Sequence, residues 1–346
     1  MQSNNYLNSL TGLRGLAALI VTISHTYLYS SINTMSVGNL GDFSVAVFFS
    51  LSGFLMGYIY AGKDFDNSAV QGYIISRTSR IAPAYLAIVL ISFILFSFID
   101  PSFPIQIDTS NLMRHLLFSG NQSVLWSIPP EIQFYSLFLA LWYSIDSYKK
   151  QKSSLYLILF ALLCGVMLIF SSKMPGTFVG SKIEYFMLGV LAGIFRKRLP
   201  ASLLEKNILI IQFIILAGFS YFISELTNNY QAVNEFWSNQ HYALLSSIIV
   251  YTLSFQTKLT AFLFNNKAMQ NLGIWSFSLY LTHSITIHYF SKLIPIDSLL
   301  KEIAAILIAI LISYCFYRVV EVKGIKASRL ILLSAVKPST RPKESS

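Results

Sequence analysis

The sequence is poor in charged residues: only 12% of its 346 residues are Asp, Glu, Lys or Arg, whereas a soluble domain carries about 25%. It has two cysteines, Cys164 and Cys315, in separate apolar stretches, so neither a disulfide framework nor a cysteine metal site is expected. With 17 glycines and 10 prolines, it is not collagen-like. Apolar residues make up 54% of the chain, and this hydrophobicity excludes an intrinsically disordered protein.

Long stretches without charge account for most of the apolar residues. Seven stretches of 18 or more residues contain no Asp, Glu, Lys or Arg, and a bilayer core needs about 20 mainly apolar residues to be crossed. Three shorter runs reach that length if charges at their ends extend to the interface. The sequence therefore predicts an all-α polytopic membrane protein with about ten transmembrane helices, at 15–41, 43–62, 81–99, 132–145, 153–172, 185–195, 207–224, 236–257, 268–291 and 303–317.

The basic residues divide unevenly between the two sides that ten helices define. Short cytoplasmic loops collect Lys and Arg, whereas exported loops do not. With a cytoplasmic N-terminus, the outer connections hold only Arg114, Lys173, Lys182, Lys292 and Lys301. We therefore expect both termini in the cytoplasm. The net charge of +10 follows this topology and forms no compact basic domain, so no nucleic-acid partner is expected.

No soluble domain fits between the predicted helices. The longest connection, about residues 100–128, contains Pro101 and Pro104 and has room for one short amphipathic segment. Residues 1–330 are therefore expected to form a single transmembrane domain. Residues 331–346 are expected to be a polar, disordered cytoplasmic tail, because the chain ends in KPSTRPKESS.

Ionisable side chains inside membrane spans are costly, so each one is a functional hypothesis. Arg14 and His25 are eleven positions apart in the first span, which places them on one helix face within about 20° and roughly 16 Å apart along the axis. A ligand with anionic groups at one end and a reactive group at the other suits this spacing. The structural alternative is that Arg14 extends to lipid phosphate and His25 donates to a carbonyl of a neighbouring helix.

Arg77 and Arg80 are three positions apart and share one helix face at the cytoplasmic mouth of the third span. Guanidinium groups bind phosphate oxygens through paired hydrogen bonds, so this pair predicts a site for a phosphorylated cofactor. Positive-inside topology also explains the charges, although not their spacing. Glu131 follows Pro129 and Pro130 at a helix start, where it either caps the helix or orients an imidazole.

Metal-site patterns are absent from the sequence. His283 and His288 are five residues apart, about 140° round a helix, so they form no metal pair on one face. No cluster of His, Cys, Asp and Glu has metal-ligand spacing. The chain also lacks a G-x-S-x-G elbow and a Walker loop. We therefore expect no metal.

Five sequence blocks follow one another in a fixed order. They are LTGLRGLAALIVTISH, which contains Arg14 and His25 as R-x10-H, then GDFSVAVFFSLSGFLMGY, RTSRIAPAYL, WSIPPEIQFY and LGIWSFSLYLTH. Together, from about Leu10 to Glu321, they resemble the acyltransferase-3 family of integral membrane O-acyltransferases. The chain departs from the family at Ala46, where many members have an acid, and after Glu321, where they often read E-x-P.

The resemblance implies transfer of an acyl group, usually acetyl, from cytoplasmic acetyl-CoA to a hydroxyl of a carbohydrate or lipid-linked glycan such as a surface polysaccharide. It places the chain in the plasma (inner) membrane. The CoA phosphates would meet Arg14, Arg77 and Arg80 near the inner surface. His25 would act as general base or accept the acyl group itself, and Glu131 would orient it; the sequence leaves these two mechanisms open.

Three further residues are expected to contact substrate. Trp126 and Tyr135 would polarise the thioester carbonyl or serve only as interfacial anchors, and His283 would line the acceptor side. Membrane lipids are the other expected partner. A transporter or flippase for a lipid-linked glycan also explains ten spans with buried ionisable residues, whereas a non-catalytic scaffold gives no reason for them.

Overall fold

The computed structural model describes residues 8–27, 37–151, 153–198, 207–228, 233–294 and 298–336. Within these ranges every regular element is a helix, which confirms the all-α fold class. The α-helices are α1 (Asn8–Tyr27), α2 (Val37–Tyr60), α3 (Asn67–Ile94), α4 (Leu112–Leu116), α5 (Ile128–Lys149), α6 (Leu155–Phe170), α7 (Ile183–Arg198), α8 (Ile208–Asn228), α9 (Val233–Ser238), α10 (Gln240–Leu253), α11 (Lys258–Phe264), α12 (Lys267–Leu293), α13 (Leu299–Phe316) and α14 (Val322–Val336). Short 3₁₀ or π segments are η2 (Leu95–Ile99), η3 (Ser123–Ser127), η4 (Ser171–Lys173), η5 (Val179–Lys182) and η7 (Tyr317–Glu321).

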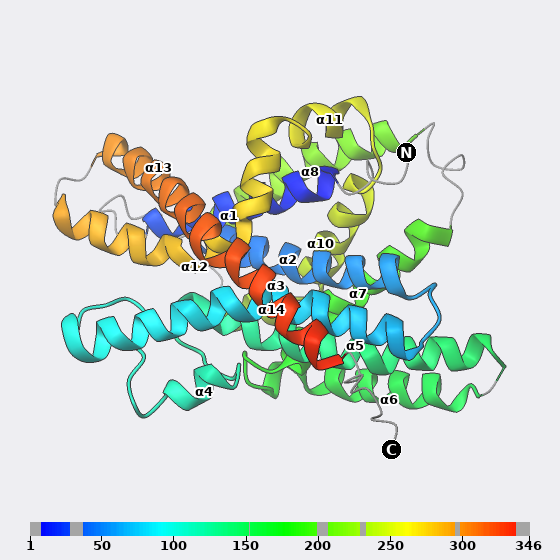
Figure 1. Ribbon diagram of the computed structural model, residues 1–346. Coiled ribbons are helices and arrows are strands. Elements are labelled where there is room, and N and C mark those ends of the chain that lie inside the picture. The colour runs from blue at the N-terminus through cyan, green and yellow to red at the C-terminus, as the bar shows by residue number, and fades with distance from the viewer. Residues whose placement is uncertain are drawn as a thin grey trace, which may run out of the picture.

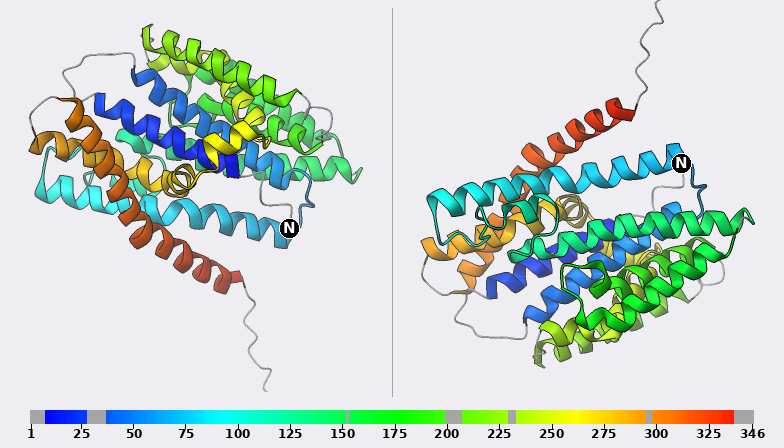
Figure 2. Two further views of the ribbon diagram at one scale, coloured as in Figure 1. Left: turned by 90° about the horizontal axis from the view of Figure 1, so that it is seen from above. Right: turned by 90° about the horizontal axis from the view of Figure 1, so that it is seen from below.

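The helices form a bundle with α1 and α2 near its middle. In Figure 1, α5 and α6 lie along one side and α8 and α11 along the opposite side. Helices α13 and α14, joined by η7, cross the bundle as one long rod, and the two views of Figure 2 show the same arrangement. Helices α1 and α2 therefore have packed neighbours on both sides, where polar side chains are sheltered from lipid.

Several helix starts carry the capping residues that the chain supplies locally. The carboxylate of Asp66 accepts a hydrogen bond from the backbone N–H of Ala69 at the start of α3. Asn266 accepts from the N–H of Met269 at the start of α12. These contacts satisfy backbone donors that the first helical turn leaves without partners, so they fix where α3 and α12 begin.

Glycines allow two helix pairs to approach closely. A Cβ atom on Gly53 of α2 would clash with the carbonyl oxygen of Phe186 on α7. In the same way, a Cβ on Gly273 of α12 would clash with the backbone of Thr11 on α1. Small residues at helix crossings are typical of membrane bundles, where van der Waals packing holds the helices together. The pairs α2–α7 and α1–α12 therefore form the rigid centre of the bundle.

Apolar side chains on the outer helices face away from the protein. On α6, for example, Ile158, Leu162 and Ile169 are exposed, as expected for a helix that contacts lipid tails. Five helical segments are long and apolar enough to cross a membrane: Asn39–Tyr60, Asn67–Ile99, Ser123–Lys149, Leu155–Lys173 and Leu299–Ser334. A sixth is obtained if α10 and α11, which meet at a bend of 106°, count as one span. The membrane nature of the chain is thus supported.

The prediction of ten spans is met only in part. The other four predicted spans do contain helices, namely α1, α7, α8 and α12, but these helices fall short in length or hydropathy within the described residues. Ten spans and cytoplasmic termini stay predictions. Helix α14 continues to Val336, past the predicted start of the tail at residue 331, and residues 337–346 lie outside the described ranges, so the tail stays a prediction. The connection at 100–128 contains the short helix α4, in agreement with one short segment there.

Candidate active site

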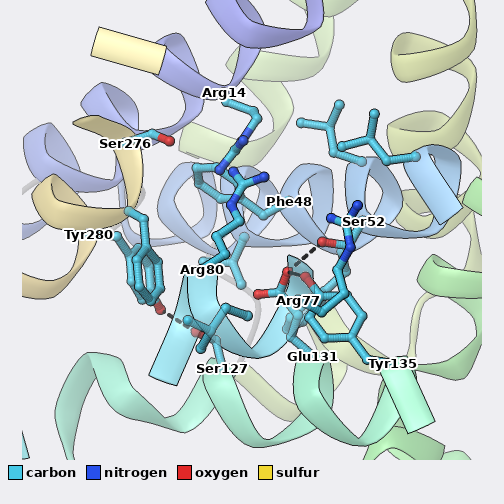
Figure 3. Close-up of a pocket in the computed structure, with 16 residues that line it drawn as sticks. Arg14, Phe48, Ser52, Arg77, Arg80, Ser127, Glu131, Tyr135, Ser276 and Tyr280 are labelled. Carbon is cyan, nitrogen blue, oxygen red and sulfur yellow. Dashed lines mark hydrogen bonds between the residues drawn. The ribbon is translucent and has the colours of Figure 1, made fainter. Parts of the chain in front are cut away.

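A cavity between α1, α2, α3, α5 and α12 brings together five of the residues that the sequence singles out. It encloses about 680 Å³ of empty space, its open mouth included. We call it the arginine cavity; its lining is Arg14, Val45, Phe48, Phe49, Leu51, Ser52, Leu55, Arg77, Arg80, Ile81, Ser127, Glu131, Tyr135, Ser276, Phe277 and Tyr280. The cavity thus collects all three predicted phosphate-binding arginines, together with Glu131 and Tyr135 (Figure 3).

The three guanidinium groups enter the cavity from two helices. Arg14 comes from α1 and extends toward Arg80 of α3 in Figure 3. Arg77 is buried, and its guanidinium lies 5.7 Å from the ring centre of Tyr60 and 5.9 Å from that of Tyr135. These distances are within cation–π range.

The three arginines form no ion pair with the described residues. No carboxylate of the described residues lies within ion-pair distance of Arg14, Arg77 or Arg80. The buried Nε of Arg77 also has no hydrogen-bond partner among these residues. A buried cation without a counterion is costly, so the arrangement favours an anionic ligand in the cavity.

Glu131 lies in the first turn of α5, where Pro129 and Pro130 begin the helix and the helix dipole stabilises a carboxylate. Its Oε1 accepts hydrogen bonds from Ser52 Oγ and Tyr135 OH, each at 2.6 Å. Within the described residues, this carboxylate forms no hydrogen bond with His25. Glu131 therefore positions Ser52 and Tyr135 at the cavity wall, a contact that the sequence did not predict.

His25 and His283 form a pair beside the cavity. Their rings meet edge to face with centres 4.7 Å apart. The Nδ1 of His25 lies 2.9 Å from the carbonyl oxygen of Val21, and that of His283 lies 2.9 Å from the oxygen of Leu279. Because a carbonyl only accepts, each Nδ1 carries the proton when the rings are neutral, and each Nε2 presents a lone pair.

The pair does not line the arginine cavity itself. His283 is fully buried, and its Nε2 has no partner in the described part of the chain. Tyr280 links the two places: it lines the cavity, its ring centre lies 5.9 Å from that of His283, and its hydroxyl accepts a 2.8 Å hydrogen bond from Ser127 Oγ. Tyr280 is therefore the cavity residue that contacts the histidine pair.

Trp126 lines a second cavity, which we call the indole cavity. It encloses about 1260 Å³ of empty space, its open mouth included. Its lining is Asp42, Arg114, Asn121, Trp126, Ser171, Ser172, Met174, Pro175, Gly176, Thr177, Ser181, Lys182, Trp237 and Ser238. Neither His25 nor His283 is among these residues, so the predicted place of His283 on the acceptor side stays a prediction.

Lys182 is the most buried cation of the indole cavity. It lies in η5, outside the helices long enough to span a membrane. Its Nζ is 4.3 Å from the ring centre of Trp237 and 5.9 Å from that of Trp126. Burial lowers the pKa of Lys182 to about 8, and the nearby carboxylates of Glu184 and Asp42 oppose that shift. The ammonium is therefore close to its titration point near neutral pH.

Several residues of the site were missed by sequence reasoning. Ser276 and Tyr280 lie four positions apart on α12, with His283 three positions further, so a polar stripe at helical spacing was the available signal. Ser52 stands in the FFSLSGF segment without a charge to mark it. Asp42 and Lys182 come from different parts of the chain, and no spacing rule connects them. Within the described ranges, no group of three or more His, Cys, Asp or Glu is placed to hold a metal.

Comparisons with known proteins point to one family. The acyltransferase-3 family model, described as an acyltransferase domain, matches residues 7–318. Over 158 residues the chain is 32% identical to acyltransferase MdmB of Streptomyces mycarofaciens, a region that covers 40% of this chain and 40% of that protein. The chain thus spans about two fifths of the length of this curated relative. No solved structure matches the chain significantly.

Proposed function

Because the chain belongs to the acyltransferase-3 family, we propose that it is a multi-pass O-acyltransferase of the plasma (inner) membrane that moves an acetyl group from acetyl-CoA to a hydroxyl of a carbohydrate or lipid-linked glycan. The observation that carries the proposal is the convergence of Arg14, Arg77 and Arg80 on one cavity without a carboxylate partner. The transporter alternative has no support from the family or from the relative's name.

The donor's phosphates are the anions that this cavity suits. Guanidinium groups bind phosphate oxygens through charge-assisted, often paired hydrogen bonds. With ten spans and cytoplasmic termini, Arg77 and Arg80 would face the inner surface, where acetyl-CoA is present. The phosphates would bind the three arginines, and the thioester end would extend past Tyr280 toward His25.

The Nε2 of His25 would take part in one of two balanced reactions. As a general base, it accepts the proton of the acceptor hydroxyl while that oxygen attacks the thioester carbon; the C–S bond breaks, and the proton passes to the CoA sulfur. As a nucleophile, Nε2 attacks the thioester carbon and CoA leaves as its thiolate; the acceptor hydroxyl then displaces the imidazole, and its proton passes to the CoA thiolate. The Nδ1 contact with Val21 fixes the tautomer that both routes need.

Other residues around the cavity would support this step. Tyr135 donates its one hydroxyl proton to Glu131, and it would turn that proton to the thioester oxygen as negative charge develops there. Glu131 would act through Tyr135 and Ser52. His283 would hold the ring of His25 in place through their edge-to-face contact. Trp126 would contact the acceptor.

The test uses purified protein in lipid nanodiscs with radiolabelled acetyl-CoA and surface glycan from the producing cells. His25→Ala should lower acetyl transfer by about 100- to 10,000-fold, the usual contribution of a general base. His241→Ala is the matched control, because His241 is exposed at the start of α10 and lies outside both cavities. Transfer at the wild-type rate by His25→Ala, in protein that elutes as the wild type does, would remove His25 from the mechanism. Glycan movement without any use of acetyl-CoA would instead identify a transporter.

A further inference from the structure

Two cavities are separated by a thin aromatic partition. Phe49 lines the arginine cavity, and its ring centre lies 6.3 Å from that of Trp126 and 6.0 Å from that of Trp237. Trp126 and Trp237 line the indole cavity. Two consecutive residues of η3 face different cavities: Trp126 lines the indole cavity, and Ser127 lines the arginine cavity. A ligand in one cavity is therefore separated from a ligand in the other by about one layer of side chains.

The lining of the indole cavity mixes aromatic and hydrogen-bonding groups. Trp126 and Trp237 meet edge to face with ring centres 5.4 Å apart. Around them lie a carboxylate from Asp42, the ammonium of Lys182, the amide of Asn121 and several serine and threonine hydroxyls. A purely apolar ligand would leave these polar groups without partners, which costs binding energy. A ligand with many hydroxyls satisfies both donors and acceptors, while its C–H faces pack on the indoles.

Asp42 and Lys182 form the centre of the polar lining. Asp42 is half-buried on α2, and Lys182 is buried and in electrostatic contact with it. An acid and a base side by side offer an acceptor and a donor to adjacent hydroxyls of one ring. Asp42 is also two helical turns from Phe49 on the same helix, so a ring bound here lies next to the partition.

We infer that the indole cavity is the acceptor site and holds one sugar unit, packed on Trp126 and Trp237 with its hydroxyls on Asp42 and Lys182. The inference rests on the proposed function for its role in acyl transfer, although the sugar site itself does not depend on it. The hydroxyl that receives the acetyl group extends out of the indole cavity toward His25, the group that the thioester approaches from the arginine cavity.

The test is a titration of tryptophan fluorescence in nanodiscs with the methyl β-glycosides of glucose, galactose and N-acetylglucosamine. We expect saturable binding of at least one glycoside and loss of its signal in Trp126→Phe and Trp237→Phe. Trp275→Phe should keep the signal, because Trp275 packs on Tyr314 and lines neither cavity. The isosteric change Asp42→Asn should raise the Kd at least fivefold, whereas Asp64→Asn, at an exposed site, should not.

Binding of acetyl-CoA is measured on the same samples so that the two proposals fail separately. Unchanged acetyl-CoA binding in Asp42→Asn, with a weaker glycoside affinity, supports the acceptor site. Saturable glycoside binding without any use of acetyl-CoA keeps the sugar site and refutes acyl transfer. Absence of saturable binding by all three glycosides, or equal affinity in Asp42→Asn and the wild type, overturns the inference.

Discussion

The arginine cavity and the indole cavity are built from different kinds of segment. The arginine cavity is lined almost wholly by helical residues, and its charges sit at helical spacing on α1 and α3. The indole cavity takes much of its lining from the short segments around η3, η4 and η5. The first carries three cations without an acid in ion-pair range, whereas the second sets an acid beside a base. The difference favours a polyanionic ligand in the arginine cavity and a neutral polar ligand in the indole cavity.

The largest expected difference between the two cavities is the loss of acetyl-CoA affinity when one arginine in each is replaced by alanine. Loss of a hydrogen bond to a charged group costs about 1.5–3 kcal/mol, so Arg77→Ala should weaken acetyl-CoA binding by about 10- to 150-fold. Arg114→Ala, in the indole cavity, should leave that affinity unchanged. Isothermal titration calorimetry with both variants measures this. Equal affinities in the two variants would show that the phosphates bind elsewhere.

A change in α2 should damage both cavities together, because α2 lines each of them. A methyl group added by Gly53→Ala clashes with α7, and overpacking of this kind costs about 1–3 kcal/mol. We expect a lower Tm in detergent and weaker binding of both acetyl-CoA and glycoside. Gly165→Ala on α6 is the matched control, since its added methyl group meets open space. A Tm for Gly53→Ala equal to that of this control would contradict the close packing of α2 and α7.

The smallest expected effect is a pH dependence of the indole cavity alone. The pKa of Lys182 is about 8, so the ammonium is present below that pH and is lost above it. Asp42 and Glu184 are the charged groups that face it. Because charge-assisted hydrogen bonds are about twice as strong as neutral ones, glycoside Kd should rise about two- to fivefold from pH 7 to pH 9. In Lys182→Met the rise of the glycoside Kd above pH 8 should be smaller than in the wild type; a slope identical to that of the wild type would assign the titration to another group.

The sequence predicted the arginine cavity better than the indole cavity, for a physical reason. Arg77 and Arg80 share a helix face because of the 3.6-residue period, so their spacing alone indicates a common site. Asp42, Lys182 and Trp237 meet only through packing of distant segments, which has no period to detect. A single sequence therefore gives little indication that single loop residues belong to one binding site.

The count of ten spans is not confirmed by helix length and hydropathy, for a related reason. The absence of charged residues predicts a membrane span, but the mean hydropathy of an uncharged stretch is low when serine, threonine and histidine are frequent in it. Helix α12 is 27 residues long yet is not among the five apolar spans, because its sequence KAMQNLGIWSFSLYLTHSITIHYFSKL is rich in such residues. The polar residues that we propose for function are among those that lower the hydropathy of α1 and α12. Their helices were predicted at the right place, although their membrane crossing was not confirmed.

The neighbouring positions of Trp126 and Ser127 give this protein a built-in reporter. The two residues share one rigid peptide unit. A tilt of η3 caused by a ligand in one cavity therefore also moves the lining of the other cavity. If acetyl-CoA binds the arginine cavity as proposed, we expect the emission of Trp126 to change on binding. The order in which the two proposed substrates bind could then be followed without a dye.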